Sequence, residues 1–321
     1  MISAINYNSA SALKNFLEKE SLGMRKRFGQ NFLINPETRR SLVEALGANT
    51  GDEVWEIGPG LGAMTTLLLE RKLTVCAFEI DAGFIRILKD IFAGEKNFRL
   101  AEGDVMKTWQ NHFSCKPPDS KAGNKDAPFL MGNLPYNIAA AFLADLIEKG
   151  RLFSRMVVTV QKEVALRMTA AAGSGDYSSF SVLCASVYNV KPLMLIRPSS
   201  FYPQPNVDSM GILLENKKTD MYPPVFYPLV RSLFASRRKT IKNNLLSFIS
   251  SRQGNLPAGI THKDFCTALL NENGLRGNER AETLELERFV SLARSMETFA
   301  SQSPSVSTAI KGNKTPDLNI H

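Results

Sequence analysis

From residue 53 onward, short apolar runs alternate with helical patterns, and this alternation limits the possible folds more than any other feature of the chain. Each run has six or seven residues, the length of a buried strand. The predicted strands are EVWEIG (53–58), TVCAFEI (74–80), FRLAEGD (98–104), FLMGNL (129–134), RMVVTVQ (155–161), LMLIRP (193–198) and SMGILLE (209–215). Helical spacing separates the early runs, in MTTLLLERK (64–72) and GFIRILKDIF (83–92). This rhythm predicts an α/β fold with a mostly parallel sheet that helices cover on both faces.

The pattern changes near residue 217, after which only helical spacing is present. Four amphipathic segments predict helices, namely VFYPLVRSLFAS (225–236), TIKNNLLSFISS (240–251), HKDFCTALLNEN (262–273) and LERFVSLARSM (286–296). The chain is therefore predicted to contain an α/β domain over residues 24–216 and a small all-helical domain over residues 217–298.

Three further segments are predicted to lie outside these domains. The N-terminal lead, residues 1–23, contains one short amphipathic helix in SALKNFLEKE. Residues 112–128 are rich in Pro, Gly and Lys without periodicity, which predicts a surface loop. The polar residues 299–321 predict a disordered tail. After the lead, Asn35 and Pro36 predict the start of a helix, because Asn is a good N-cap and Pro suits the first helical position.

The composition narrows the class of protein. Lys and Arg number 39 against 31 acidic residues, and the net charge of +8 favours an acidic partner, most commonly nucleic acid. A basic surface without a ligand explains the charge equally well.

The four cysteines form no CxxC pair and there are three histidines, so reduced thiols in a cytoplasm are expected rather than disulfides or a zinc site. Neither a membrane span nor a signal peptide is expected.

The segment EVWEIGPGLGAMTTLLLE combines a predicted strand, a glycine turn and a predicted helix. Gly58 and Gly60 can take positive φ and let the backbone approach a ligand, beside the free N–H groups of a helix start. Glu79 ends the next strand, where it can accept hydrogen bonds from ribose hydroxyls. Asp104 ends the third strand, where an acid can meet an adenine amino group or simply cap a helix. The turn alone is compatible with an NAD enzyme, with an adenosyl-type cofactor, or with a purely structural role.

The turn after the fourth predicted strand is Asn133-Leu134-Pro135-Tyr136. The Asn133 amide oxygen and the Leu134 carbonyl, which precedes a proline, are two acceptors that suit the exocyclic amine of adenine. The Tyr136 ring can stack on that base. Accepting both hydrogens frees the nitrogen lone pair for in-line attack on a sulfonium methyl group, and positioning then replaces a general base. A β-turn selected for turn chemistry alone is the alternative.

Six motifs resemble those of the ribosomal RNA adenine N6,N6-dimethyltransferases that act on small-subunit RNA, and they occur in the order of that family. The motifs are RKRFGQNFL (25–33), EIGPGLG (56–62), GNLPYN (132–137), QKEVALRM (161–168), SSFYPQPNVDS (199–209) and RRKTIKNNL (237–245). The resemblance spans about residues 24–290. A dehydrogenase has no reason to carry these motifs, so the resemblance displaces the NAD interpretation.

The resemblance implies a Rossmann-like class I methyltransferase sheet with an antiparallel last strand, a small helical C-terminal domain, and S-adenosylmethionine as cofactor. It assigns the cofactor to Asn31, Leu33, Gly58, Gly60, Glu79 (ribose), Asp104 (adenine) and Asn133. It assigns the target adenosine to Asn133, the Leu134 carbonyl and the ring of Tyr136, with Phe201 on the other side of the flipped base. A core position for Phe201 beside a Pro-rich turn is the alternative.

Two basic clusters are predicted to bind RNA phosphates with little base specificity. Residues 25–27 (Arg-Lys-Arg) precede the GQNFL motif, and Arg237, Arg238, Lys239 and Lys242 are expected to begin a helix of the second domain. A solvated charged face is the alternative for each cluster.

The resemblance implies an enzyme that converts two adjacent adenosines in the 3′-terminal hairpin of small-subunit (16S) ribosomal RNA to N6,N6-dimethyladenosine, with a role in subunit biogenesis. Its expected partners are that RNA and the 30S precursor, and a monomer in the cytoplasm suits such an enzyme. Methylation of large-subunit RNA and a purely assembly-related binding role remain the alternatives. Ser178 occupies a position where the family commonly has Gly, so the conformation of that loop is left open.

Overall fold

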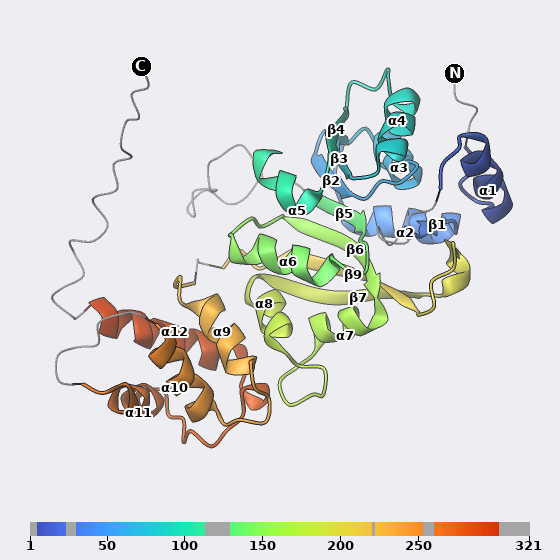
Figure 1. Cartoon of the computed structure of the whole chain (residues 1–321). Coiled ribbons are helices and arrows are strands. Elements are labelled where there is room, and N and C mark those ends of the chain that lie inside the picture. The colour runs from blue at the N-terminus through green and yellow to red at the C-terminus, as the bar shows by residue number, and fades with distance from the viewer. Residues whose placement is uncertain (1–4, 24–29, 113–128, 220–221, 253–259, 302–321) are drawn as a thin grey trace, which may run out of the picture. The chain divides into compact units, whose positions relative to one another are not determined.

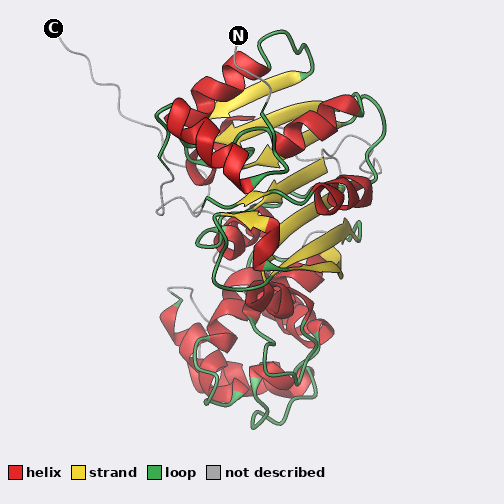
Figure 2. Cartoon of the chain, turned by 90° about the vertical axis from the view of Figure 1, so that its right-hand side faces the viewer, coloured by secondary structure: helices red, strands yellow, loops and turns green. Residues whose placement is uncertain are grey.

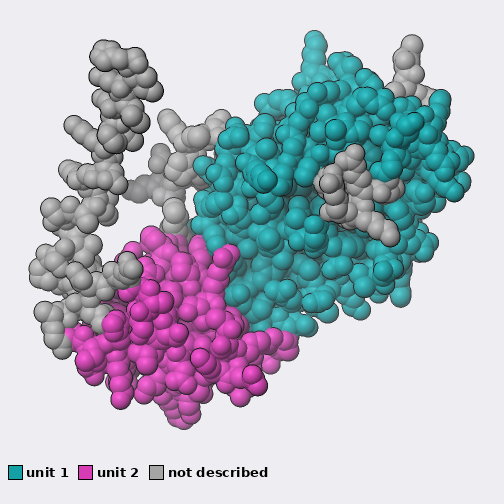
Figure 3. Space-filling model, viewed as in Figure 1, with its two compact units in different colours: residues 1–170, 176–220 teal, residues 171–175, 221–321 magenta. Residues whose placement is uncertain are grey.

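The structure is a computed structural model that describes residues 5–23, 30–112, 129–219, 222–252 and 260–301. Two compact units are present, one formed by residues 1–170 and 176–220 and the other by residues 171–175 and 221–321 (Figure 3). Most of the predicted surface loop and nearly all of the predicted disordered tail lie outside the described residues. The division of roles between the two domains stays a prediction.

The described part of unit 1 is built on a seven-stranded sheet with the order β4-β3-β2-β5-β6-β9-β7. The strands are β2 (Glu53–Ile57), β3 (Thr74–Glu79), β4 (Phe98–Glu102), β5 (Phe129–Asn133), β6 (Arg155–Gln161), β7 (Tyr188–Ile196) and β9 (Ser209–Asn216). The five strands from β4 to β6 run parallel, whereas β9 pairs antiparallel with both β6 and β7. Helices lie on both faces of the sheet (Figure 2). The predicted α/β class and the antiparallel last strand are therefore confirmed.

The helices described in unit 1 include four that the sequence predicts and four that it does not. The predicted helices are α1 (Ala10–Lys19), α2 (Pro36–Leu46), α3 (Ala63–Glu70) and α4 (Ala82–Ile91). As expected, the Asn35 side chain caps α2, with its Oδ1 accepting from the Thr38 N–H at 2.9 Å. The additional helices are α6 (Ala139–Glu148), α7 (Lys162–Thr169) and α8 (Ser179–Val187), together with the short α5 (Val105–Thr108). Helix α8 is buried along most of its length, so its sequence carries no amphipathic period.

Two strand features correct the sequence analysis. Strand β7 begins at Tyr188, five residues before the predicted start. The predicted strand starts just after Pro192, and a proline rarely lies inside a strand. Here the strand is at the edge of the sheet, and an irregularity in its pairing between Pro192 and Met194 accommodates the proline. A separate two-stranded ladder joins β1 (Phe32–Leu33) to β8 (Phe201–Tyr202), which follows a 3₁₀ turn at Pro198–Ser200. Neither short strand was predicted, since two residues are too few to show alternation.

The core of unit 1 has one layer on each face of the sheet. On one face, Leu42 and Leu46 of α2 and Leu68 of α3 pack on Val54, Val75 and other apolar strand residues. On the opposite face, Trp55 contacts Phe78 at a ring-centroid distance of 4.7 Å and Phe153 at 5.5 Å. Burial on both faces explains why these strands read as continuous apolar runs.

The described part of unit 2 is helical, as predicted. Its helices are α9 (Phe226–Phe234), α10 (Ile241–Ser251), α11 (His262–Glu272) and α12 (Leu286–Ser301), with a 3₁₀ turn at Ala281–Thr283. Helix α12 extends three residues into the segment predicted as tail. The buried Asn244 of α10 donates to the carbonyls of Leu233 and Ser236, and so closes the end of α9. Residues 171–175 join this unit through the Gly173 N–H, which donates to the Glu282 carbonyl at 2.7 Å.

Replacing Gly132 of β5 by alanine is expected to lower the free energy of unfolding by about 1–3 kcal/mol, a typical cost of overpacking. A Cβ at this position would lie 2.9 Å from the Ile57 carbonyl oxygen of β2, and backbone atoms cannot move aside cheaply. Urea denaturation measures the change. Gly94→Ala is the control, because a Cβ there would meet no atom within 4 Å. Equal stability of the two variants would contradict the prediction.

Candidate active site

The two turns that the sequence analysis selected meet at one point of the sheet. The chain order reverses between β2 and β5, because β3 and β4 lie on one side of β2 and the later strands on the other. Parallel pairing places Ile57 opposite Gly132, so the glycine turn after β2 and the Asn-Leu-Pro-Tyr turn after β5 leave the sheet side by side. Ligands of open α/β sheets bind at such a reversal, outside the carboxyl ends of the strands.

A cavity of about 290 Å³ opens at this position. Its lining brings together six of the seven residues predicted to bind the cofactor, namely Asn31, Gly58, Gly60, Glu79, Asp104 and Asn133. Apolar side chains supply other parts of the wall, among them Phe32, Ile80 and Phe84. A mostly apolar wall with a few convergent polar groups is typical of a small-molecule site.

The seventh predicted residue, Leu33, does not line the cavity with its side chain. Successive side chains of a strand point to opposite faces, and in β1 this places Phe32 at the cavity and Leu33 in the hydrophobic core. Phe32 is thus a site residue that the sequence analysis missed. No sequence signal identifies it, because the two residues of β1 are too few to show which side chain turns toward the cavity.

The glycine turn has the conformation that the sequence predicts. Gly58, Gly60 and Gly62 have φ values of 68°, 59° and 89°, a region that side chains with a Cβ rarely adopt. Space is also short, since a Cβ on Gly60 would lie 2.9 Å from the Phe32 ring. The Gly60 N–H donates to Glu79 Oε2 at 3.2 Å, so the carboxylate at the end of β3 holds the turn.

Glu79 is buried and accepts three backbone hydrogen bonds. In addition to the Gly60 contact, its Oε1 accepts from the N–H groups of Ile80 and Asp81, each at 2.9 Å. Burial raises the pKa of Glu79 to about 7 in spite of these bonds, and the buried Asp81 adds to the effect. Four lone-pair sites on a carboxylate leave capacity for a further donor from the cavity.

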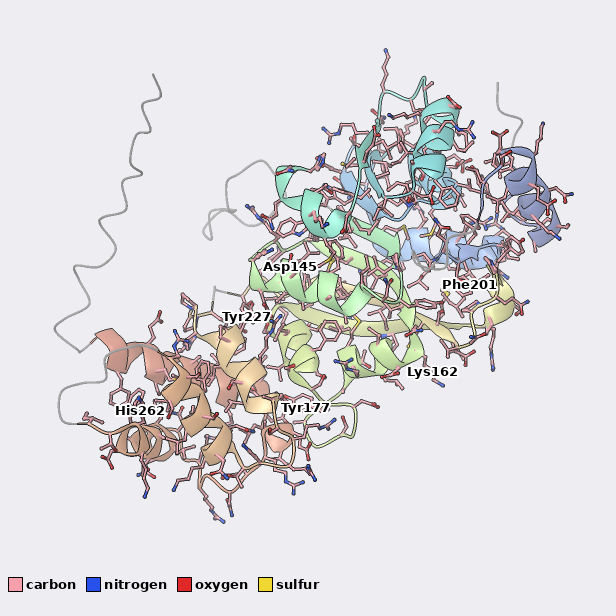
Figure 4. All side chains as sticks on the ribbon, in the orientation of Figure 1. Asp145, Lys162, Tyr177, Phe201, Tyr227 and His262 are labelled. Atoms are coloured by element: carbon pink, nitrogen blue, oxygen red, sulfur yellow. The ribbon has the colours of Figure 1, made fainter. Side chains whose placement is uncertain are left out.

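Asp104 acts as a helix cap, one of the two interpretations that the sequence left open, and its contact with an adenine stays a prediction. Its Oδ1 accepts from the Met106 N–H at 3.0 Å and so caps α5, as an ordinary helix cap does. The same side chain lies in the wall of the cavity. Beyond it, the Trp109 Nε1–H donates to Asp145 of α6 at 3.1 Å, which fixes the segment that follows Asp104 (Figure 4 labels Asp145).

The Asn133 amide has a defined orientation. Its Nδ2 donates to the Asn31 carbonyl at 2.6 Å, a contact between residues 102 positions apart, and the amide oxygen is the remaining polar atom. Within the described part of the chain, no group donates to Asn133 Oδ1 or to the Leu134 carbonyl oxygen. Both oxygens therefore keep unused acceptor capacity; Asn133 lines the cavity, whereas Leu134 is 1% exposed and does not.

The Tyr136 ring is held by its hydroxyl. This hydroxyl shares a 2.6 Å hydrogen bond with Ser209 Oγ, at the start of β9, and Ser209 is fully buried. Burial raises the pKa of Tyr136. Tyr136 as a whole is half-buried, and stacking on a base needs a ring that is not fully covered.

Phe201 is 1% exposed and packs in the same core cluster as Leu33, its partner in the β1–β8 ladder. Figure 4 shows it in β8. The structure thus gives Phe201 a core role, which was the alternative considered, and its contact with a target base stays a prediction. Its position opposite Leu33 in the ladder explains the burial, because both side chains pack in this core cluster.

The basic residues of unit 2 differ in their surroundings. Arg237, Arg238 and Lys239 lie in the turn before α10 rather than in its first turn, which corrects the predicted position. Arg237 is engaged, with Nε 3.1 Å from Glu282 Oε2 and Nη2 donating to the Gly175 carbonyl. Arg238 and Lys239 are exposed. The cluster at residues 25–27 lies outside the described residues.

The described residues contain neither a candidate metal site nor a membrane-spanning helix. In the described ranges of the chain, no group of three His, Cys, Asp or Glu side chains is arranged to hold a metal ion. In the same ranges, no helix is both long and apolar enough to cross a membrane.

The strand order, the glycine turn and the cavity at the carboxyl ends of β2 and β5 define a class I methyltransferase. A family model described as ribosomal RNA adenine dimethylase matches residues 22–289, and the chain belongs to this family. The "Ribosomal RNA small subunit methyltransferase A" of Treponema denticola is 44% identical over 91% of this chain and 96% of its own. The family resemblance drawn from the motifs is thereby confirmed.

Solved structures agree with this assignment. A dimethyladenosine transferase from Plasmodium falciparum superposes with a TM-score of 0.68 at 25% identity, over 82% of this chain and 96% of that one. The 23S rRNA methyltransferase ErmE shares the fold, with a TM-score of 0.57 at 20% identity over 83% and 99% of the two chains. The protein is a methyltransferase that uses S-adenosylmethionine, and ribosomal RNA is its class of substrate.

The stability of unit 1 is expected to depend on pH through Glu56, which is buried on β2 and accepts from Thr65 Oγ1 at 2.6 Å. Burial raises the pKa of Glu56 from 4.5 to about 7. Between pH 4.5 and 7, Glu56 is protonated in the folded state and largely ionised in the unfolded state. The stability that comes from this tighter proton binding is therefore lost as pH rises through about 7. In Glu56→Gln, the fall in unfolding free energy from pH 5 to pH 8 should be smaller by about 2–3 kcal/mol.

Chemical denaturation at several pH values measures this difference. The exposed Glu95 provides the control, since Glu95→Gln should leave the pH dependence of the wild type in place. A Glu56→Gln variant with the pH dependence of the wild type would show that Glu56 does not carry the effect.

Proposed function

We propose that this enzyme transfers methyl groups to N6 of two adjacent adenosines in the 3′-terminal hairpin of small-subunit ribosomal RNA. The observation that carries the proposal is the pair of acceptors without a donor, Asn133 Oδ1 in the cavity wall and the carbonyl of the following residue, Leu134. An adenine N6 amine has two hydrogens to donate to such a pair. The small-subunit substrate is the one named for the Treponema relative.

In the proposed site, the cavity holds the cofactor. The residues of the cavity fit the group, because Glu79 has acceptor capacity for ribose hydroxyls, Asp104 offers a carboxylate to an adenine amino group, and the glycines leave the backbone uncovered. S-adenosylmethionine supplies an electrophilic methyl group when bound. Asn31 fixes the Asn133 amide through its carbonyl, so that the amide oxygen is oriented before the substrate arrives.

The target adenosine is proposed to enter beside Tyr136. The ring would stack on the flipped base, and Ser209 keeps the ring in place through its hydroxyl. Asn133 Oδ1 and the Leu134 carbonyl would accept the two N6 hydrogens and direct the nitrogen lone pair at the methyl group. Each adenosine needs two transfers, so the same acceptors must also admit a monomethylated amine with one remaining hydrogen.

The remaining proposals concern partners. Arg238 and Lys239 would bind RNA phosphates, together with Arg237 if its pair with Glu282 opens. We propose the 30S precursor as the binding partner, a monomer as the active form, and the cytoplasm as the location, since the substrate is assembled there.

Methylation of large-subunit RNA is the alternative to the proposed substrate. It is weaker, because the likeness to ErmE at 20% identity concerns the fold alone. A role in subunit assembly through binding can coexist with catalysis.

Incubation of small ribosomal subunits from a strain that lacks this activity with the purified protein and methyl-labelled S-adenosylmethionine tests the substrate. Digestion of the RNA and mass spectrometry of its nucleosides should yield N6,N6-dimethyladenosine from the 3′-terminal hairpin. Label in large-subunit RNA would assign the alternative substrate. Cofactor binding without transfer to assembled subunits would leave a binding role only.

The variant Asn133→Ala is expected to lower the turnover number about 10²–10³-fold, the usual effect of removing one oriented polar group at the reacting centre. It removes one of the two acceptors and leaves the Leu134 carbonyl. Single-turnover methylation of small subunits measures the change, and a filter-binding assay shows whether subunits are still bound.

Asn189→Ala is the matched control, because Asn189 is an exposed asparagine on the edge strand β7. This variant should methylate at the wild-type rate. If Asn133→Ala binds subunits and also methylates at the wild-type rate, the acceptor mechanism is refuted.

A further inference from the structure

The N-terminal lead, described over residues 5–23, packs against the glycine turn, β1 and α4 of unit 1, although residues 5–21 precede the segment that the family model matches. Figure 1 shows α1 in dark blue beside β1. Its apolar side chains Leu13, Phe16 and Leu17 form a buried cluster with residues of the glycine turn and of α4. The lead therefore belongs structurally to the cofactor side of unit 1.

This cluster directly supports the cavity wall. It includes Phe84 of α4, and Phe32 of β1 packs against it. Both rings also line the cavity, and their centroids lie 5.6 Å apart. Removing the lead would expose the outer side of both rings to water and allow them to move.

The first polar attachment joins the lead to the glycine turn. The Tyr7 hydroxyl donates to the Leu61 carbonyl at 2.9 Å, and Leu61 itself is 1% exposed within the same cluster. Glu79 holds the neighbouring Gly60 N–H from the cavity side. The turn is thus fixed from two sides.

The second attachment joins the lead to β1 through Arg39 of α2. This guanidinium is 5% exposed, and it donates from Nη1 to the carbonyls of Leu33 and Tyr7 and from Nη2 to Asn8 Oδ1. All of these acceptors are neutral oxygens. A buried cation is costly unless its donors are satisfied, so Arg39 favours the state in which the lead is in place.

The third attachment joins the end of the lead to α4. The Leu22 side chain lies against Gly83, where an added Cβ would approach Leu22 Cδ2 to 2.4 Å. Arg86 pairs with Glu20 at 3.2 Å. Three attachments thus end on the glycine turn, on β1 and on the start of α4, and each of these segments contributes to the cavity wall.

We propose that the N-terminal lead fixes the cofactor site in its binding conformation and that Tyr7 is a positioning residue for the glycine turn. The inference rests on the proposed assignment of the cavity to S-adenosylmethionine. The physical reason is entropic. A turn with three glycines at positive φ has many accessible conformations. The apparent affinity for the cofactor is lower when the turn spends less time in the conformation that binds it.

The test is Tyr7→Phe, which removes one hydroxyl and keeps the ring in its cluster. The dissociation constant for S-adenosylmethionine, measured by isothermal titration calorimetry on the full chain, should rise about fivefold, as expected for one neutral hydrogen bond. The turnover number at saturating cofactor, and the KM for small subunits, should stay within twofold of the wild type.

Two control variants separate the outcomes. Tyr188→Phe removes another buried tyrosine hydroxyl, which accepts from the Phe153 N–H at 3.0 Å away from the cavity lining, and should leave cofactor affinity unchanged. An equal loss of affinity in Tyr188→Phe would overturn the inference, because general destabilisation would then explain both variants. Glu79→Gln tests the cavity itself and should weaken cofactor binding.

The remaining results are equally decisive. Unchanged affinity in Tyr7→Phe together with weaker binding in Glu79→Gln would overturn the role of the lead and keep the cavity assignment. Unchanged affinity in both variants would overturn the cavity assignment as well. A lower turnover number with unchanged affinity would also contradict the inference, since it would place Tyr7 in the chemical step.

Discussion

The close parallel pairing of β2 with β5 is the constraint on which the site depends. Ile57 lies opposite Gly132, and the absence of a Cβ at Gly132 lets the two strands approach at their carboxyl ends. Because both turns leave the sheet at this point, the glycine turn and the Asn-Leu-Pro-Tyr turn face one cavity. A donor site and an acceptor site for a methyl group need this proximity, since in-line transfer requires the reacting atoms to be nearly in contact.

Buried carboxylates accompany this arrangement. Glu56 lies one residue before the end of β2, Glu79 ends the adjacent parallel strand β3, and burial brings the pKa of each to about 7. Glu79 accepts hydrogen bonds from backbone N–H groups of the glycine turn and of its own strand end, and in the proposed function it also meets the ribose. A site that orders its own backbone before the ligand arrives loses less entropy when the ligand binds.

The predictable elements carry a local signal in the sequence. The amphipathic α1 and α4 follow from their helical period, the Asn35 cap from its residue type, and the seven strands from short apolar runs that end at turn residues. Helix α8 is apolar on all sides because it is buried, and the two residues of β1 are too few to show a period. For the same reason Phe32 was missed and Leu33 was placed at the cavity: the residues were recognised, but the face that β1 turns inward was not.

The sequence by itself determined the strand and helix rhythm, the positive-φ glycines, the family motifs and six of the residues that line the cavity. Only the tertiary structure decided which distant groups meet. The Asn31 carbonyl orients the Asn133 amide across 102 residues, Tyr7 reaches Leu61 across 54, and Phe201 lies in the core. Local patterns report the environment of each residue, whereas these contacts depend on the order and direction in which strands pair, which no single segment encodes.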